Sequence, residues 1–510
     1  MLIGSSVTLS ASSAFNQYIW TNKVGDTISV DREVIVDNLQ ESDCFMVYVE
    51  DDNGCNDYCE TCVTVGSKPF DAFSPNGDGY NDYWVIEDID KLIENGTYFD
   101  QTISSAASTI LAVSSLLTGI YPFKLGLGGT DYKKYPSDSN NIAKILNENG
   151  YTTYVTAPEI ASDFGLVCDF KNPDTTYDNY FSLFAGLGDE IINKFKKNIL
   201  QSPWFFYIHL FDLHTPVIVP SSFDDQKFGK SQYERMVSAI DDWIFRLLEN
   251  IDKKNTIIII TSDHGEIIPV VETKDGIISL ESSTTDKTLW KLGNKVPKNL
   301  YPLKQKMGSV IRKSREKIKS TTLEQNELSE YEKRILTTTR MSSGHKLYDD
   351  FLRIPLLFTG PGIPKQKYVK NLVRQIDIFP TILEILNLSI PEKIDGKSLS
   401  SFMNDESVND SFAFIESPPT VTQSSLKFIG IRDSQYKYIR SLDKEKNISE
   451  LYDLVNDPLE EKNISSERPE IIKNMNKSLN ELRNLNIKEH NFNEAEKEKV
   501  EKTLKKLGYI

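Results

Sequence analysis

Three short apolar segments, each followed by a polar loop, most constrain what this chain can fold into. They are PWFFYIHLFDLHTP, NTIIIITSDHGE and RIPLLFTGPGIP, at residues 203–216, 255–266 and 353–364. Helical patterns separate them, and residues 140–156 show a helix, a glycine stop and a strand in succession. Continuous apolar strands that alternate with helices predict an α/β domain whose mostly parallel sheet is sandwiched by helices. Functional side chains gather at the carboxyl ends of such strands.

The first 66 residues follow a different pattern. Short segments with period-two alternation are separated by Asn, Asp and Gly turns, which predicts a small all-β, immunoglobulin-like domain. Residues 67–89 then form a Gly- and Asp-rich linker. Its residues Asn76, Asp78 and Asp82 have a spacing that suits calcium, although a plain turn explains them equally well.

Four of the five cysteines lie in this first region, at Cys44, Cys55, Cys59 and Cys62. The last three have the spacing of some iron–sulfur sites. One or two disulfides in a small exported β-domain are the better interpretation.

We assign residues 90–420 to a catalytic domain and residues 421–510 to a C-terminal α+β subdomain with a helical tail. Residues 267–341 interrupt the catalytic domain as a basic helical insertion, in which residues 291–320 carry ten Lys or Arg and one acid. A solvated insertion is favoured over a mobile lid that attracts an anionic substrate.

The overall composition excludes some partners. A net charge of −16 in 510 residues argues against nucleic acid. No apolar run is long enough to span a bilayer. The N-terminus also lacks the charged and apolar regions of a signal peptide.

Histidine is rare, with five residues in the chain. His209 and His214 follow the first apolar segment, His264 follows Asp263 after the second, and His345 precedes the third. One histidine alone is more often structural, but four at such places favour a site. A divalent cation with carboxylate and imidazole ligands would lower the pKa of a hydroxyl group and balance the charge of a tetrahedral anion.

A hydroxyl nucleophile could come from residues 104–122, SSAASTILAVSSLLTGIYP. This segment offers Ser104, Ser105, Ser108 and Thr109 just before a helical pattern. A helix N-terminus attracts sulfate or phosphate oxygens. Helix capping is the alternative role for these hydroxyls.

Residues 90 to about 480 resemble the sulfatases, within the alkaline-phosphatase-like superfamily. The resemblance is carried by colinear segments that include SSLLTGIYP, HLFDLHTP, TSDHGE, GHKLYDDFLRIPLLFTGPGIP, RQIDIFPTILEILNL and ELYDLVNDPLEEKNI. It implies an alkaline-phosphatase-like fold and a metal-dependent hydrolase of sulfate esters or phosphate mono- or diesters. Residues 1–89 resemble an Ig-like repeat followed by the start of a gliding-motility-type C-terminal sorting module, so the chain has the pattern of a chimera.

The same resemblance implies roles for individual residues. Thr109 matches the family nucleophile, with Ser108 as the alternative one residue away. Asp263 and His264, together with Thr109, match ligands of one divalent ion, which could be Ca, Mn, Mg or Zn. The substrate would be a small or a lipid- or glycan-linked anionic ester.

The remaining histidines also have counterparts in the family. His214 matches a catalytic histidine that faces the anionic or leaving group, and His345 matches a metal-side or leaving-group histidine. His209, Asp212 and Arg353 match structural supports. A periplasmic, extracellular or cell-surface location is expected from the family and from the N-terminal module.

The sequence departs from the family pattern at two places. Residues 109–113, TILAV, lack the proline and arginine of the C/S-x-P/A-x-R motif, so no formylglycine is expected and an unmodified Thr109 is the predicted nucleophile. The acidic pair that ends the first strand of the family has no counterpart before Thr109. An inactive sulfatase-like binding or surface protein is therefore one alternative, and a phosphoglycerol-type transferase is another.

Overall fold

The computed structural model describes the chain except for residues 1–4, 12–14, 16, 23–25, 40–42, 51–55, 64–86, 129–132, 137, 173–175, 178–182, 274–275, 282–326, 339–344, 405, 407–410, 419–425, 444–445, 447, 484–491 and 507–510. The chain divides into two compact units. One comprises Met1–Asp71 with Gly77–Ile86, and the other comprises Ala72–Asn76 with Glu87–Ile510.

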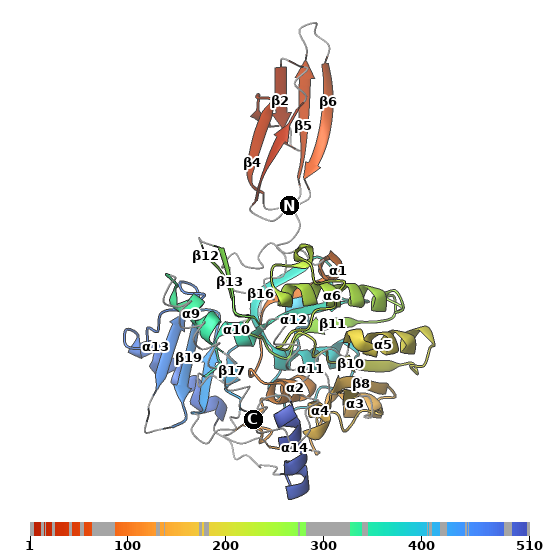
Figure 1. Ribbon diagram of the computed structural model, residues 1–510, viewed down its shortest axis with the longest axis vertical. Helices are drawn as coiled ribbons and strands as arrows, with labels where there is room; N and C mark the ends of the chain where they lie inside the picture. Colours follow the sequence, from red (N-terminus) through yellow and green to blue (C-terminus); the bar gives the residue numbers. More distant parts are fainter. Residues whose placement is uncertain are drawn as a thin grey trace, which may run out of the picture. The chain divides into compact units, whose positions relative to one another are not determined.

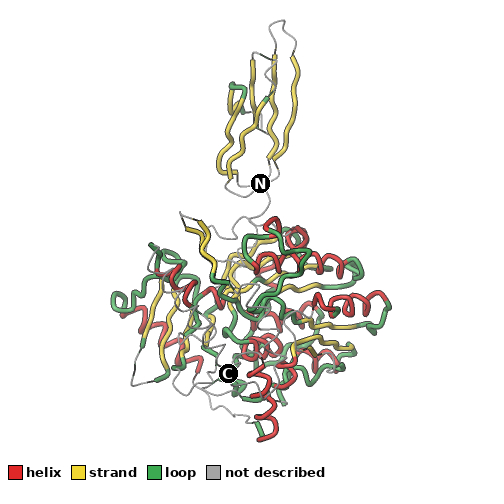
Figure 2. The backbone as a smooth tube through the Cα atoms, viewed as in Figure 1, coloured by secondary structure: helices red, strands yellow, loops and turns green. Residues whose placement is uncertain are grey.

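The described strands of the first unit form two antiparallel sheets (Figure 2). One contains β1 (Ser5–Ser10) and β4 (Glu33–Leu39), and the other has the order β3 (Thr27–Ser29), β2 (Gln17–Thr21), β5 (Asp43–Glu50) and β6 (Asn56–Val63). Alternate residues of β5, Phe45, Val47 and Val49, pack with Trp20 in one core. The prediction of a small all-β N-terminal part is confirmed, while its immunoglobulin-like character stays a prediction.

The cysteines of this unit fall partly outside the described residues. Cys55 lies outside them, as does the predicted calcium loop at Asn76, Asp78 and Asp82. Cys44 stands opposite Cys62 in the register of β5 and β6, and Cys59 is exposed.

The second unit has two sheets at its centre. The first contains β7 (Gly96–Ile103), β11 (Ile258–Thr261), β14 (Arg353–Ile354), β15 (Leu356–Thr359) and β16 (Lys367–Arg374). Strand β16 runs parallel to β7, and β15 is antiparallel to both β7 and β11, so β7, β11 and β16 share one direction. The second sheet is parallel and has the order β10 (Trp204–Ile208), β8 (Thr152–Pro158), β9 (Thr176–Tyr177).

Helices cover both sides of these strands (Figure 1). On one side lie α1 (Glu87–Glu94), α5 (Leu187–Lys196) and α6 (Gln232–Leu248). The short helix η1 (Leu183–Ala185) contacts α5, and η2 (Gln226–Phe228) contacts α6. On the other side lie α2 (Thr109–Thr118), α3 (Ile142–Glu148), α4 (Glu159–Asp163) and α11 (Ile378–Ile385), which η4 (Gln375–Asp377) precedes. The predicted α/β fold, with strands between layers of helices, is confirmed.

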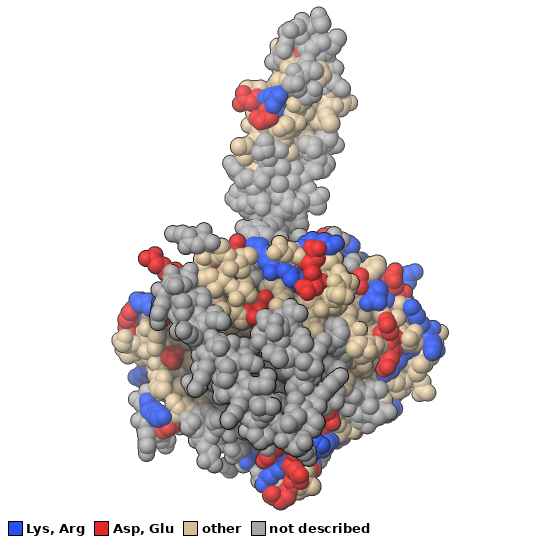
Figure 3. Space-filling model, viewed as in Figure 1, with Lys and Arg blue, Asp and Glu red and all other residues tan. Residues whose placement is uncertain are grey.

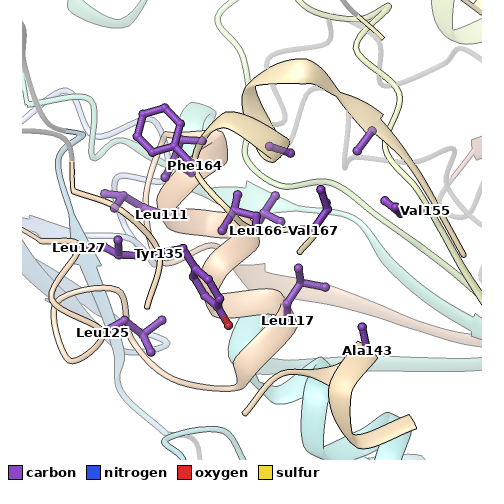
Figure 4. Close-up of a cluster of buried hydrophobic side chains, with 14 of the residues drawn as sticks. Leu111, Leu117, Leu125, Leu127, Tyr135, Ala143, Val155, Phe164, Leu166 and Val167 are labelled. Carbon is purple, nitrogen blue, oxygen red and sulfur yellow. The ribbon is translucent and has the colours of Figure 1, made fainter. Parts of the chain in front are cut away.

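Helix α2 forms the middle of the largest apolar cluster (Figure 4). All but one of its ten residues are buried, so the helix is enclosed on every side. Leu111 and Leu117 pack with Val155 of β8 and Phe164 after α4. Gly119 ends the helix in the left-handed region, at φ 68°, where a side chain would meet the ring of Phe379.

A further sheet follows near the C-terminus, with the antiparallel order β17 (Ala413–Glu416), β18 (Phe428–Arg432), β19 (Tyr436–Ser441), β20 (Ser449–Asp453). Helix α13 (Pro469–Arg483) packs on it through Met475 and Leu479. Helix α14 (Glu494–Lys506) instead contacts α4. The predicted α+β character of this end is confirmed, although β17 precedes the predicted boundary at residue 421.

The remaining described elements are β12 (Val270–Thr273) and β13 (Gly276–Ser279), which form a hairpin, α9 (Glu330–Thr337), α10 (Asp349–Leu352) and α12 (Ser400–Met403). The basic residues 291–320 of the predicted insertion lie outside the described residues. In the part of the chain that is described, no helix has the length and apolar character needed to cross a membrane. On the face drawn in Figure 3, Lys and Arg are interspersed with Asp and Glu.

Candidate active site

The loop after β11 carries two of the predicted site residues, Asp263 and His264. Gln375 of η4 holds this loop, because its Nε2 donates to the carbonyls of Ser262 at 3.0 Å and Asp263 at 2.8 Å. Ser104 Oγ also donates to the carbonyl of Asp263, at 2.7 Å. The loop therefore has its backbone fixed by side chains from two distant parts of the chain.

The side chains of Asp263 and His264 face each other and a hydroxyl. His264 Nδ1 lies 2.7 Å from the carbonyl of Gly265, and since a carbonyl only accepts, this nitrogen carries the proton. Its Nε2 lies 3.5 Å from Thr109 Oγ1 and 3.5 Å from Asp263 Oδ2. The imidazole lone pair, the carboxylate and the hydroxyl thus converge.

Thr109 owes its position to the start of α2. It is the first residue of this ten-residue helix, follows the extended N-cap Ser108, and is only 5% exposed. No acidic residue lies in the first turn of the helix. The hydroxyl therefore lies at a helix N-terminus, where the backbone dipole favours negative charge.

The segment after β10 brings His209 and His214 to a cavity that Thr109, Asp263 and His264 also line. His209 Nε2 lies 3.8 Å from Asp263 Oδ2, and its Nδ1 lies 2.9 Å from the hydroxyl of Tyr207. His214 Nδ1 donates to the carbonyl of Thr215 at 3.0 Å, and the ring stacks on Phe211 with centroids 4.3 Å apart.

Burial and neighbouring charges shift several pKa values here. Burial raises the pKa of Asp263, but the charges of His264 and His209 and a hydrogen bond from Thr109 bring it below its ordinary value. Burial lowers the pKa of His209. Burial also raises the pKa of Glu266 to about 7, against a smaller opposing effect of His264.

These groups line a cavity of about 1070 Å³. It contains Thr109, His209, His214, Asp263 and His264 in its wall. Over the described residues, no group of three or more His, Cys, Asp or Glu side chains is placed to hold a metal ion. Asp263 and His264 nevertheless fit part of a coordination sphere, since carboxylate oxygen and imidazole nitrogen are common ligands of divalent metals.

His345 is not among the residues that line this cavity. Its Nε2 is 2.9 Å from Glu450 Oε2 on β20, and its Nδ1 accepts from the backbone N–H of Leu347 at 2.9 Å. Its ring contacts Tyr348 and Phe428. The structure thus places Thr109 beside the Asp263–His264 pair, and His214 lines the same cavity; the catalytic roles of Thr109, His214 and His345 stay predictions.

Of the three residues predicted as structural supports, Arg353 and Asp212 form hydrogen bonds with other segments of the chain. Arg353 donates to the carbonyl and carboxylate of Asp100, the latter at 2.7 Å. Asp212 is fully buried and accepts from the N–H of Leu183 at 3.3 Å. His209, by contrast, contacts the carboxylate of Asp263 directly.

The sequence reasoning did not identify Gln375 and Glu266 as site residues. Both lie inside segments that carry the family resemblance, RQIDIFPTILEILNL and TSDHGE. Their place in these segments is the sequence feature that could have marked them as site residues. What was lacking is the fold, which brings Gln375 to a loop 112 residues earlier in the chain.

Two family models match this chain. The sulfatase model matches residues 67–388, more than half of the chain. The model for the C-terminal region of N-sulphoglucosamine sulphohydrolase matches residues 343–485. The first match includes residues 67–89, the predicted linker.

Individual proteins and structures agree with these matches. Arylsulfatase K of Mus musculus is 31% identical over 144 residues, 27% of this chain and 26% of that protein, so the chain spans about a quarter of the length of this relative. The ulvan-active sulfatase of Formosa agariphila is 22% identical over 474 residues, 79% of each chain. The crystal structure of the phosphonate monoester hydrolase of Agrobacterium radiobacter has a TM-score of 0.55 at 15% identity and covers 82% of this chain and 93% of that one. The last similarity concerns the fold alone.

Proposed function

Because the chain belongs to the sulfatase family, we propose that it hydrolyses sulfate esters, or phosphate esters of similar shape, with Thr109 as its nucleophile. One observation carries the choice of residue. The hydroxyl of Thr109 lies at the N-terminus of α2 and 3.5 Å from His264 Nε2, beside the carboxylate of Asp263. Of the four candidate hydroxyls, that of Ser104 is already bonded to backbone carbonyls.

In this proposal Thr109, His214 and the start of α2 each have a chemical role. The Thr109 hydroxyl loses its proton to water, and its Oγ1 attacks the sulfur or phosphorus, so that a covalent ester forms while the bond to the leaving oxygen breaks. His214 lines the same cavity and gives a proton to the departing alcohol. Water then hydrolyses the ester, which releases the anion and restores the hydroxyl. Backbone N–H groups at the start of α2 stabilise the negative charge that develops on the transferred group.

A divalent cation fits the donors Asp263, His264 and Thr109. When bound, it would lower the pKa of the hydroxyl and offset charge on the anion. Its identity among Ca, Mn, Mg and Zn is part of the test below. Ser108 and Thr109 lie outside any C/S-x-P/A-x-R motif, so the proposal uses an unmodified threonine.

The test is turnover of 4-nitrophenyl sulfate and bis(4-nitrophenyl) phosphate with each of the four metals. Thr109→Ala should reduce kcat/KM by about 100-fold or more, because removal of a nucleophile leaves only binding and electrostatic effects. Ser108→Ala is the matched control and should stay within about five-fold of wild type, as expected for a residue that only flanks the chemistry. Equal rates for Thr109→Ala and wild type would overturn the assignment.

The substrate class is proposed as a sulfated glycan. The support is the resemblance to an ulvan-active sulfatase along most of both chains. Release of inorganic sulfate from sulfated polysaccharides, compared with release of phosphate from phosphodiesters, would decide between the two ester classes.

A second candidate is a non-catalytic surface or binding protein. It is favoured by the missing third His, Cys, Asp or Glu ligand among the described residues of the cavity. Calorimetric titration with each metal distinguishes the two, since a complete site binds tightly at pH 7 and an incomplete one binds weakly.

A further inference from the structure

A second, smaller pocket lies where the central sheet of β7, β14 and β16 meets the C-terminal sheet. Its volume is about 200 Å³. The central sheet contributes Gln101, Arg353 and Lys370 to its wall, and β18 and the turn after it contribute Arg432 and Ser434. Of the described residues in this wall, Arg353 alone also lines the cavity of the candidate active site. The two cavities are therefore distinct.

The wall of this pocket carries more positive than negative charge. It contains three cations, Arg353, Lys370 and Arg432, and one carboxylate, that of Asp349. Arg353 is paired at 2.7 Å with Asp100, which is not part of the wall. Lys370 forms no ion pair with a described residue. The excess of positive charge is local, because the chain as a whole has a net charge of −16.

The carboxylate in the wall is shared between two cations. Asp349 Oδ2 lies 2.8 Å from Arg432 Nη2, and Asp349 Oδ1 lies 2.5 Å from the buried Nζ of Lys437. Lys437 has a second partner, Glu460, at 2.7 Å. Asp349 therefore offsets the charge of Arg432 only in part.

The guanidinium group of Arg432 has donors left over. The residue is only 3% exposed, and its Nη2 donates to Gln101 Oε1 at 3.0 Å and to Asp349. Its Nε and Nη1 are buried and have no hydrogen-bond partner within the described part of the chain. Buried charged donors without an acceptor destabilise a folded protein, so an acceptor is expected beside Arg432.

The pocket is open to solvent and small. Lys370, Ser434 and Pro458 in its wall are exposed, so a dissolved ion can reach it. Its volume of about 200 Å³ is below the roughly 300–1,000 Å³ of sites that hold drug-sized molecules. Size and access thus favour a small ion.

We propose that this pocket, the anion pocket, binds a tetrahedral oxyanion, sulfate or phosphate. Guanidinium and ammonium groups are the donors that such ions take in proteins, and the hydroxyl of Ser434 adds another. A water molecule would accept from Arg432 but would not offset the positive charge. The proposal is independent of the proposed function, because the ester chemistry uses no residue of this wall.

An ion in the anion pocket would act on the candidate active site through α10. Asp349 is the first residue of this helix. The carbonyl of Phe351 accepts from the N–H of Gly265 at 2.8 Å, and that of Leu352 accepts from the N–H of Ser104 at 2.7 Å. The ion would therefore fix the start of a helix that holds both the loop after β11 and the segment before α2.

The test is equilibrium dialysis of the full chain against radiolabelled sulfate and, separately, radiolabelled phosphate, with the ionic strength held constant by sodium chloride. A saturable site is expected. Lys370→Glu should weaken its affinity about ten-fold or more, because it replaces an attractive charge by a repulsive one. Lys365→Glu is the matched control, an exposed lysine just before β16 that does not line the pocket, and should change the affinity less than about two-fold.

Binding in the catalytic cavity would give a different pattern. His264→Ala would weaken it and Lys370→Glu would not, whereas the anion pocket predicts the reverse. Saturable binding of either ion that depends on Lys370 supports the proposal, and the ion that binds more tightly is then the preferred ligand. The proposal fails if neither ion binds saturably, if Lys370→Glu binds as tightly as wild type, or if His264→Ala alone removes the binding.

Discussion

Asp212 gives the sharpest test of how the segment after β10 is held. Its side chain is fully buried, and burial raises the pKa of this carboxyl from 3.8 to about 7. The N–H of Leu183 donates to Oδ1 and partly opposes the effect of burial. Oδ2 has no hydrogen-bond partner within the described residues. The folded protein therefore binds a proton at Asp212 more tightly than the unfolded chain does.

The sign and size of the effect follow from this difference. A carboxyl whose folded pKa is raised contributes stability below its unfolded pKa, and this contribution is lost as the pH rises through the folded value. The shift of about three units corresponds to roughly 4 kcal/mol in total, at 1.36 kcal/mol per unit. Between pH 5 and pH 8 the loss is roughly 2–3 kcal/mol, because the curve levels off above about pH 7.

Asp212→Asn removes this dependence and retains an oxygen that can accept from Leu183. The free energy of unfolding of the variant minus that of wild type should increase by roughly 2–3 kcal/mol from pH 5 to pH 8. Urea titrations at pH 5, 6, 7 and 8, followed by tryptophan fluorescence, measure it. Asp189→Asn is the matched control, an exposed carboxyl on α5, and its difference from wild type should stay within about 0.5 kcal/mol at every pH. A pH-independent difference for Asp212→Asn would refute the argument.

Three further predictions concern the loop of the candidate site and His345. Gly265→Ala should unfold or distort the loop and abolish turnover, because its Cβ would lie 2.1 Å from the carbonyl oxygen of Asp350; circular dichroism and kinetics compare the variant with wild type, and wild-type turnover would contradict this. Gln375→Met should lower kcat about ten-fold or more with little change in KM, because two hydrogen bonds that orient the loop are lost. A fall in kcat that only matches the fraction of unfolded variant protein would contradict this. His345→Ala should cost about 1–3 kcal/mol of stability through its lost hydrogen bonds, with kcat changed less than ten-fold, and a larger fall in kcat would restore its predicted catalytic role.

Much of the fold could be predicted from local pattern. The alternation in β5 identifies a strand by its period, and the short, β-branched apolar run at β11 favours a strand over a helix. The resemblance to sulfatases is likewise confirmed by the family models. The Ig-like repeat and sorting module expected in residues 1–89 stay predictions, as do the domain boundaries.

The candidate site could be predicted only in its residue types. The residue pattern selected Asp263 and His264 and offered four hydroxyls, because such groups at strand ends and helix starts suit ester hydrolysis, and the family resemblance then selected Thr109 among the hydroxyls. His345 was predicted to belong to the same site only because it matches a family histidine, since a sequence carries no distances between residues. In the structure His345 binds Glu450, 105 residues later.

The sequence by itself determined where the strands and helices form and which groups could do chemistry, since propensity and periodicity are local properties. Only the tertiary structure decided which of those groups meet. Thr109 reaches His264 across 155 residues, and Gln375 fixes the loop that carries it. Arg353, Lys370 and Arg432 were likewise separate cations in the sequence, because only the packing of two sheets brings them to one pocket.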